Sequence, residues 1–353
     1  MAELPPGRGL EPRRPPGTLP DTPPDLLPDP LPGPLPDTAF RHADGTVVAL
    51  TAPNAGLREL PASIAALTTL RHIDLDGNEL TRLPASIAEL SRLRTLLLYD
   101  NRLTEVPGEL GRLTSLRDLS LGRNRLTALP ATIWDLTGLR TLNLAENELA
   151  EIPDAVANLA ELSMLDLGHN RLGRLPDAIG DLPQLTGCLY LSDNGLTTVP
   201  ASLGRLNVLD YLNLAGNRIT SLPSSMGDMA ALRELRLYDN RLTALPDTFG
   251  RLSRLRELHL RGNRLATLPH SIGDLGELRH LDLRDNPLDR LPASIGRLSR
   301  LTHLDLRASR LTELPDGVGA LPALEKLDLR WTKLHRLPGW IDSLRHHGCA
   351  VLL

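Results

Sequence analysis

Hydrophobic positions recur along this chain with a period of 23 residues. Polar residues 72, 74 and 76 alternate with Ile73 and Leu75, which predicts a short strand with one buried face. A unit of this length cannot cover its own apolar side, so the repetition predicts a solenoid of stacked units. In the unit 70–92 the apolar positions are Leu70, Ile73, Leu75, Leu80, Leu83, Ile87 and Leu90, and the units 93–115 and 116–138 repeat this spacing.

An asparagine marks the turn after each predicted strand. An amide both donates and accepts, so a buried Asn can satisfy backbone groups that a curving chain leaves unpaired. Ala55, Ser309 and Thr332 replace it toward the two ends, which predicts atypical capping units there. The column consists of Asn78, Asn101, Asn124, Asn147, Asn170, Asn194, Asn217, Asn240, Asn263 and Asn286.

Thirteen prolines follow the same period from Pro61 to Pro338 and predict about thirteen units. Because proline has a fixed φ and no N–H, it suits the first position of a short α or 3₁₀ helix such as 84–90. Asn170 and Asn194 are 24 residues apart, so one residue is inserted within 185–189. Gly187 predicts a bulge there, which is either a harmless irregularity or a functional notch.

The strand half of the unit spells L-x-x-L-x-L-x-x-N-x-L at Leu93, Leu96, Leu98, Asn101 and Leu103. This resembles the leucine-rich repeat family from about Val47 to the C-terminus. The half L-P-x-x-I-G-x-L resembles the subclass of Ras-associated scaffold proteins and plant intracellular Ras-group proteins. The resemblance implies an α/β solenoid with a parallel concave sheet, short convex helices and a protein-binding concave face.

Composition divides the chain into a Pro-rich arm, residues 1–40, and a repeat domain, residues 41–353. The arm holds thirteen of the 30 prolines and is predicted to be disordered, because it cannot bury a core. At the start of the repeats, 40–55 is expected to be a degenerate capping unit. At the far end, we expect Trp340 to cover the last layer and 350–353 to form a truncated strand.

The residue two before each Asn position is expected to project from the concave sheet. Five small residues in the middle of this column have Tyr99 at one end and Tyr238 at the other, which predicts a shallow trough. Tyr190 and Tyr211 lie in neighbouring columns, so all four tyrosines are placed on one face. Aromatic residues are only 3% of the chain, and this concentration favours a partner-binding surface over a mere strand preference for Tyr.

Charged side chains dominate the C-terminal part of the same face. Asp and Arg residues two apart on a strand project from the same face. The charged residues here therefore form either a self-neutralising ladder of ion pairs or a docking surface for a charged partner. His259, His280 and His303 also lie on this face and could bind a metal. The favoured interpretation is that they are exposed polar side chains without a ligand, and no metal or cofactor is predicted. The predicted partner-binding charges are Arg236, Arg261, Arg284, Arg307, Arg330, Asp282, Asp305 and Asp328.

Global features narrow the class of protein. A formal charge of −4 and a pI near 6.2 argue against a nucleic-acid binder. Two isolated cysteines, no apolar leader and no membrane-length run favour a cytoplasmic protein without membrane attachment. Arginine greatly outnumbers lysine, which is typical of GC-rich, bacterial coding sequences. No G-x-x-x-x-G-K-[ST], G-x-S-x-G or H-E-x-x-H motif occurs, so no enzymatic activity is predicted.

The resulting hypothesis is a monomeric, non-catalytic adaptor that binds a protein partner in intracellular signalling. A small GTPase partner follows only by analogy with the resembling scaffolds, since their R-V-x-F and G-V-Y-W motifs are missing here. The alternatives are an enzyme-linked bacterial effector of the ubiquitin-ligase type and a purely structural spacer.

Overall fold

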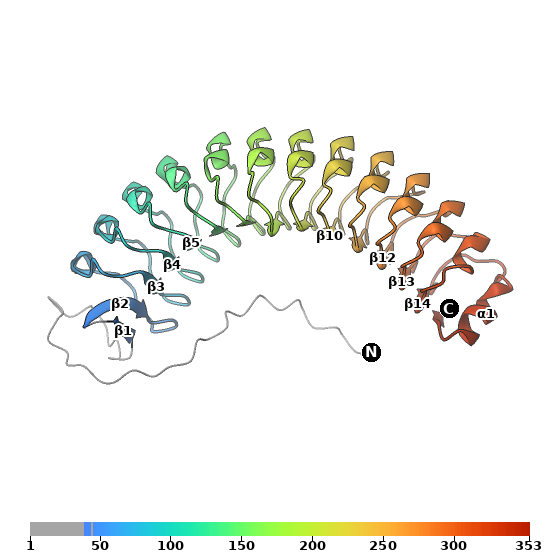
Figure 1. The fold of residues 1–353 in the computed structure, drawn as a ribbon, viewed down its shortest axis with the longest axis horizontal. Coiled ribbons are helices and arrows are strands. Elements are labelled where there is room, and N and C mark those ends of the chain that lie inside the picture. Colours follow the sequence, from blue (N-terminus) through green and yellow to red (C-terminus); the bar gives the residue numbers. More distant parts are fainter. Residues whose placement is uncertain (1–38, 44) are drawn as a thin grey trace. The chain divides into compact units, whose positions relative to one another are not determined.

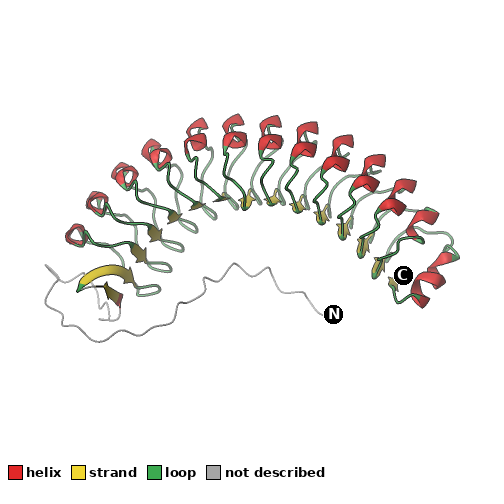
Figure 2. Ribbon diagram, in the orientation of Figure 1, coloured by secondary structure: helices red, strands yellow, loops and turns green. Residues whose placement is uncertain are grey.

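A computed structural model describes residues 39–43 and 45–353 of the chain. Its strands form one 15-stranded sheet in chain order. β1 (Phe40–Ala43) is antiparallel to β2 (Thr46–Thr51), and every later pair is parallel. In the repeat array the strands line the inner side of the arc and the short helices line the outer side (Figures 1 and 2). The predicted leucine-rich repeat solenoid is confirmed.

Each interior unit contributes one three-residue strand and one short 3₁₀ helix. The remaining strands are β3 (His72–Asp74), β4 (Thr95–Leu97), β5 (Asp118–Ser120), β6 (Thr141–Asn143), β7 (Met164–Asp166), β8 (Cys188–Tyr190), β9 (Tyr211–Asn213), β10 (Glu234–Arg236), β11 (Glu257–His259), β12 (His280–Asp282), β13 (His303–Asp305), β14 (Lys326–Asp328) and β15 (Ala350–Leu352). The 3₁₀ helices are η2 (Ala62–Ala66), η3 (Ala85–Glu89), η4 (Gly108–Arg112), η5 (Ala131–Asp135), η6 (Asp154–Asn158), η7 (Asp177–Asp181), η8 (Ala201–Arg205), η9 (Ser224–Asp228), η10 (Asp247–Arg251), η11 (His270–Asp274), η12 (Ala293–Arg297) and η13 (Asp316–Val318).

The repeating prolines lie just before these helices. Pro84 has φ −70° and ψ 141°, so it is extended and η3 begins at Ala85. Its carbonyl accepts the first turn's hydrogen bond from the Ile87 N–H at 3.0 Å. The prediction that proline is the first helical residue is therefore wrong by one position, because its ψ keeps the chain outside the helix.

The repeated leucines and asparagines form a continuous core between sheet and helices. Leu96 and Leu98 are fully buried, as are their counterparts in the other central units. The Asn101 Nδ2 donates to the carbonyls of Leu75 at 3.0 Å and Leu98 at 3.2 Å, and its Oδ1 accepts from the Leu80 N–H at 3.0 Å. The asparagine column thus joins consecutive units through the backbone groups that the turn exposes, as predicted.

The inserted residue in the 24-residue unit is Thr186. Leu185 keeps the expected core position, whereas the Gly187 N–H, rather than that of Thr186, donates to the Ser163 carbonyl at 2.9 Å. The extra residue therefore lies before β8 begins, and β7 pairs with β8 over two residue pairs. Leu182, which follows η7, is extended with ψ 97° and absorbs part of the change.

Both ends of the array differ from the interior units. The hairpin of β1 and β2 caps the first unit, with Val47, Leu50 and Ala52 buried. At the other end, α1 (Trp340–His346) places the Trp340 ring against Gly319 and the core, and β15 extends the sheet by one strand. The predicted disordered arm lies almost wholly outside the described residues. No helix in the described part is long and apolar enough to cross a membrane.

Candidate functional site

The concave face is built from alternating positions of each strand and the residue beyond it. In β4, Leu96 is fully buried between half-buried Thr95 and Leu97, and Tyr99 follows on the same side as these two. Because all units from β3 to β14 share this register, their outward side chains form three parallel columns across the sheet. The twelve predicted partner-binding residues all occupy these columns.

Three tyrosines and two arginines form one contiguous group across β8 to β11, here called the tyrosine–arginine cluster: Tyr190, Tyr211, Arg236, Tyr238 and Arg261. The rings of Tyr190 and Tyr211 are 5.0 Å apart between centroids and tilted by 45°. The guanidinium of Arg236 lies 5.4 Å from the centroid of the Tyr211 ring, and that of Arg261 lies 5.8 Å from the centroid of Tyr238. These are one tilted aromatic contact and two cation–π contacts.

Carboxylates hold the two arginines in place over the rings. The Arg236 Nε donates to Glu234 Oε1 at 2.6 Å, and the Arg261 Nη2 donates to Asp239 Oδ2 at 2.7 Å. Burial raises the pKa of both Tyr190 and Tyr211. Their hydroxyl groups therefore stay protonated at neutral pH and can donate or accept hydrogen bonds.

Tyr99 lies on the same face but apart from this cluster. Its hydroxyl donates to Glu146 Oε1 at 2.6 Å, two units further along, and its ring lies over Gly122. Tyr99 and Glu146 therefore cover the N-terminal end of the expected trough. Further along the same column, the residues Gly168, Ser192 and Ala215 next to the tyrosine–arginine cluster have small side chains or none.

The C-terminal charges form a self-neutralising ladder, which was one of the two predicted alternatives. The guanidinium of Arg307 donates to Asp305 at 2.7–3.1 Å and its Nε lies 3.4 Å from Asp328 Oδ2 in the next unit. Arg284 and Arg330 make the same bidentate contact with Asp282 and Asp328. Arg261 is the exception, because it pairs with Asp239 instead.

The pKa shifts agree with this pairing. Burial alone would raise the pKa of Asp328, but hydrogen bonds from Arg330 and the charge of Arg307 lower it. The hydrogen bond to Asp305 is the main cause of the raised pKa of Arg307. These guanidinium groups are already satisfied within the protein, so they offer little free charge to a polyanion.

A second group joins the tyrosine–arginine cluster to the ladder. The His259 Nε2 lies 3.2 Å from Glu257 Oε2, and the His280 Nδ1 lies 3.8 Å from the same oxygen. The hydrogen bond with His259 is the main cause of the lowered pKa of Glu257. Sequence reasoning considered the histidines but overlooked Glu257 as their partner, although the two-residue spacing of Glu257 and His259 places both on one face.

Carboxylates in the N-terminal part of the face have raised pKa values. Asp76 Oδ1 accepts the Tyr99 N–H at 2.7 Å, which orders the turn after β4. Burial, together with the charges of Asp74 and Asp100, raises the pKa of Asp76 to about 6 despite that hydrogen bond. Burial also raises the pKa of Asp166. These carboxylates support backbone turns within the sheet.

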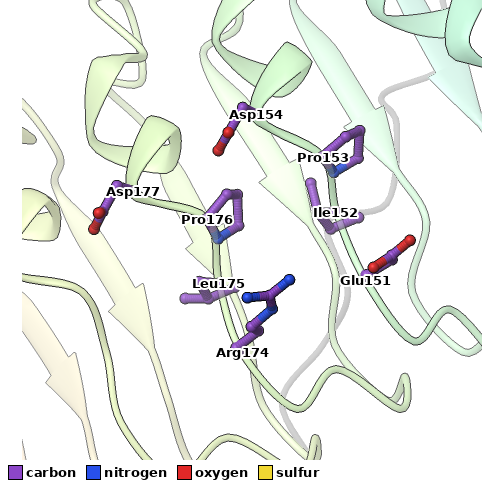
Figure 3. A pocket seen from close by; sticks show the side chains of 8 residues that line it. All are labelled: Glu151, Ile152, Pro153, Asp154, Arg174, Leu175, Pro176 and Asp177. Carbon is purple, nitrogen blue, oxygen red and sulfur yellow. The ribbon is translucent and has the colours of Figure 1, made fainter.

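One groove lies away from the concave face. It has a volume of about 550 Å³ and runs along the flank of two adjacent units, from Ile152 to Asp177 (Figure 3). Pro153 and Pro176, one period apart, line it at equivalent positions together with Glu151 and Arg174. It is therefore a groove between neighbouring units.

The architecture and the inner face define a solenoid class of protein whose exposed sheet is available for binding. The leucine-rich repeat region model matches residues 49–128 and 247–346, and the leucine rich repeat model matches residues 137–187 and 188–242. The chain belongs to the leucine-rich repeat family. Proteins of this family are generally non-catalytic binding scaffolds, and the fold indicates a protein–protein interaction module.

Solved structures of related fold agree with this assignment. A leucine-rich repeat protein of Leptospira interrogans is 33% identical, with a TM-score of 0.73, over 86% of this chain and 83% of its own. The internalin InlF of Listeria monocytogenes shares the fold, at 23% identity and a TM-score of 0.75, over 86% of each chain. The plant peptide hormone receptor RGFR1, in complex with RGF2, is 28% identical with a TM-score of 0.69, over 87% of this chain and 55% of its own. No curated protein sequence matches the chain.

Proposed function

We propose that the concave face docks a protein or peptide partner, centred on the tyrosine–arginine cluster. The single observation that carries this proposal is that these side chains meet on neighbouring units. The Tyr190 ring contacts the Tyr211 ring, Arg236 lies over Tyr211, and Arg261 lies over Tyr238. Tyrosine and arginine contribute disproportionately to binding energy at protein interfaces. Because these side chains are already ordered by one another, docking loses little side-chain entropy.

The neighbouring small residues favour an extended segment as the ligand. Ser192 and Ala215 lie in the column beside Tyr190 and Tyr211, so the sheet surface is low at these positions and a chain can run next to the rings. The peptide hormone receptor RGFR1 was solved in complex with RGF2, which supports a peptide or protein ligand for this chain by analogy. The ladder of Arg284, Arg307 and Arg330 then forms a charged but internally neutral border.

The proposed oligomeric state, cellular role and partner all depend on this docking surface. We propose a monomeric adaptor in intracellular signalling, with the repeat domain as the binding part and the Pro-rich arm, residues 1–40, outside it. A small GTPase is the partner suggested by the resemblance to Ras-associated scaffolds. The paired state of the ladder arginines favours a protein over a nucleic acid.

Selection of displayed peptides on the immobilised full-length protein tests the proposal. Peptides enriched on the wild type are titrated by calorimetry against the triple variant Tyr190→Ala, Tyr211→Ala and Tyr238→Ala. We expect affinity to fall by a factor of about thirty or more, since even one central aromatic anchor is worth about 2 kcal/mol or more. Arg251→Ala on the helical side, where Arg251 pairs with Asp228, is the matched control.

Two outcomes would reject this surface. One is equal affinity of the selected peptides for the wild type and for a triple variant that remains folded by circular dichroism. The other is an affinity loss in Arg251→Ala as large as in the triple variant.

A further inference from the structure

We propose that Glu234, Glu257, His259 and His280 form a binding site for a divalent transition-metal ion, with zinc as the reference ion. We call these four residues the histidine–glutamate cluster. The site goes beyond partner docking, and its test does not depend on finding a partner. It adjoins the tyrosine–arginine cluster through Glu234, which the Arg236 Nε contacts at 2.6 Å.

The parallel register brings the four side chains together. β10, β11 and β12 pair so that Glu234 lies beside Glu257, and Glu257 beside His280. His259 is two residues beyond Glu257 on the same strand and therefore projects from the same face. Adjacent strands are about 4.8 Å apart, so long side chains from three neighbouring strands can converge on one point above the middle strand.

Three of the four donors lie close together. Ligand atoms of Glu234, Glu257 and His259 all lie within 4.8 Å of one another, and the His280 Nδ1 adjoins this group beside Glu257. The His259 Nε2 lies 3.2 Å from Glu257 Oε2 and 3.8 Å from Glu234 Oε1, and the His280 Nδ1 lies 3.8 Å from Glu257 Oε2. A tetrahedral zinc ion with bonds of about 2.0–2.2 Å holds its ligand atoms roughly 3.3–3.6 Å apart. Glu234, Glu257 and His259 form the compact part of the site, and rotation of the His280 side chain would bring its nitrogen to the same ion.

The chemistry of the four donors selects the kind of ion. Two imidazole nitrogens and two carboxylate oxygens suit zinc, nickel or copper ions, whereas calcium and magnesium prefer oxygen donors alone. Among the ion pairs of the described residues, Glu257 is paired only with the imidazoles of His259 and His280. A divalent cation would balance its charge, while neutral imidazoles cannot.

Neighbouring residues provide the outer support that metal ligands require. The Arg236 Nε holds Glu234 from the side of the tyrosine–arginine cluster, and a carboxylate has enough lone pairs to keep this bond and bind an ion. On the other side the rings of His280 and His303 meet edge-on at 4.5 Å. His303 Nδ1 lies 3.0 Å from Thr302 Oγ1, so we assign His303 to packing and not to the ligand set.

A single histidine–carboxylate pair elsewhere in the array serves as a control for the histidine–glutamate cluster. The His169 Nε2 lies 3.3 Å from Asp193 Oδ2 in the neighbouring unit, close to the 3.2 Å between His259 and Glu257. Within the described part of the chain no second imidazole pairs with Asp193. If an imidazole beside a carboxylate sufficed, both places would bind zinc. If convergence of four donors is needed, only the histidine–glutamate cluster would.

Calorimetric titration of the untagged, chelator-treated full-length protein with zinc chloride tests the inference. We expect one tight equivalent in the wild type, and a loss of affinity of about tenfold or more in His259→Ala and in His280→Ala. His169→Ala should bind as the wild type does, and magnesium chloride should give no saturable binding. Cobalt substitution should give the intense visible absorption of a tetrahedral site, which His259→Ala should abolish.

Glu257→Gln provides a second variant that preserves side-chain size, in case removal of an imidazole disturbs the sheet. It should also weaken zinc binding, and circular dichroism establishes that the variant is folded. The inference is overturned if the wild type binds no zinc. It is equally overturned if His259→Ala and Glu257→Gln bind zinc as well as the wild type, or if His169→Ala loses as much affinity as they do.

Discussion

Tyr99 and Glu146 are 47 residues apart in sequence, yet the tyrosine hydroxyl donates to the glutamate Oε1 at 2.6 Å. The contact spans two units of the solenoid, and the absent side chain of Gly122 makes room for it. A Cβ added to Gly122 would lie 2.8 Å from Tyr99 Cδ2. The interaction therefore depends on three residues in three different units.

This contact should be visible in the ionisation of Tyr99. Its pKa is raised to about 12, first by burial and then by the hydrogen bond and negative charge of Glu146. In Glu146→Gln we expect this pKa to fall but to remain above that of free tyrosine, because burial is unchanged. Titration of the Tyr99 ring carbons by NMR measures it, with Glu148→Gln as the control. An unchanged pKa in Glu146→Gln would refute the contact.

The outer side of the array depends on a glycine in the helical segment. At Gly204 an added Cβ would lie 2.2 Å from the carbonyl oxygen of Ser225 in the next unit, so η8 and η9 would have to move apart. We expect Gly204→Ala to lower the free energy of unfolding by about 1–3 kcal/mol, as overpacked cores do.

Gly276 supplies the matched control for this substitution. It has no atom within 4 Å of an added Cβ, and it does not adopt a positive φ. Gly276→Ala should change stability by no more than about 0.5 kcal/mol in urea unfolding. Equal losses in the two variants would mean that loss of glycine itself, rather than close approach of the units, determines the result.

Strict periodicity is the reason that so much of the fold follows from the sequence. Leucine and asparagine at fixed spacings place Leu96, Leu98 and Asn101 in the core without knowledge of any distant contact. Two-residue spacing likewise places Arg307 beside Asp305. Two kinds of feature were not predicted. In one, a side chain has several possible partners in neighbouring units. In the other, a segment lacks the repeat signature.

Three examples show this limit. The β1 strand carries no ladder leucine, so nothing in 40–43 indicated an antiparallel hairpin. Pro84 lies outside its helix because its ψ remains extended, which its fixed φ does not determine. Arg261 pairs with Asp239 across units because His259 occupies the place that aspartate takes in the ladder.

The arginine–aspartate ladder should contribute most where it is least exposed. The Asp328 side chain is 0% exposed and contacts Arg330 at 2.7 Å and Arg307 at 3.4 Å. Asp328→Asn removes the charge but keeps the shape, and leaves two guanidinium groups without their partner. We expect a loss of about 2 kcal/mol in the free energy of unfolding, below the range for fully buried pairs because the arginines remain partly hydrated.

Asp228→Asn is the control for the ladder. Asp228 pairs with Arg251 on the outer side, where the side chains are 59% and 68% exposed, so its loss should be at most about 0.5 kcal/mol. Urea unfolding at low and high salt separates the two cases, because solvent screens the exposed pair more strongly. If both variants lose the same stability, the ladder has no special energetic role.

The acid dependence of stability should reveal the carboxylate of Asp76. Its pKa is raised from 3.8 to about 6, mainly by burial, with Asp74 and Asp100 adding repulsion. A carboxyl group whose pKa is higher in the folded state destabilises the fold once it ionises, so its contribution worsens as pH rises from about 4 to about 6. Asp76→Asn cannot ionise, and its side-chain oxygen can still accept the Tyr99 N–H. At pH 7.5 the variant should be more stable than the wild type by on the order of 1 kcal/mol in urea unfolding, a value reduced for partial hydration. At pH 4 this difference should largely disappear, and a difference that stays constant between the two pH values would contradict the raised pKa.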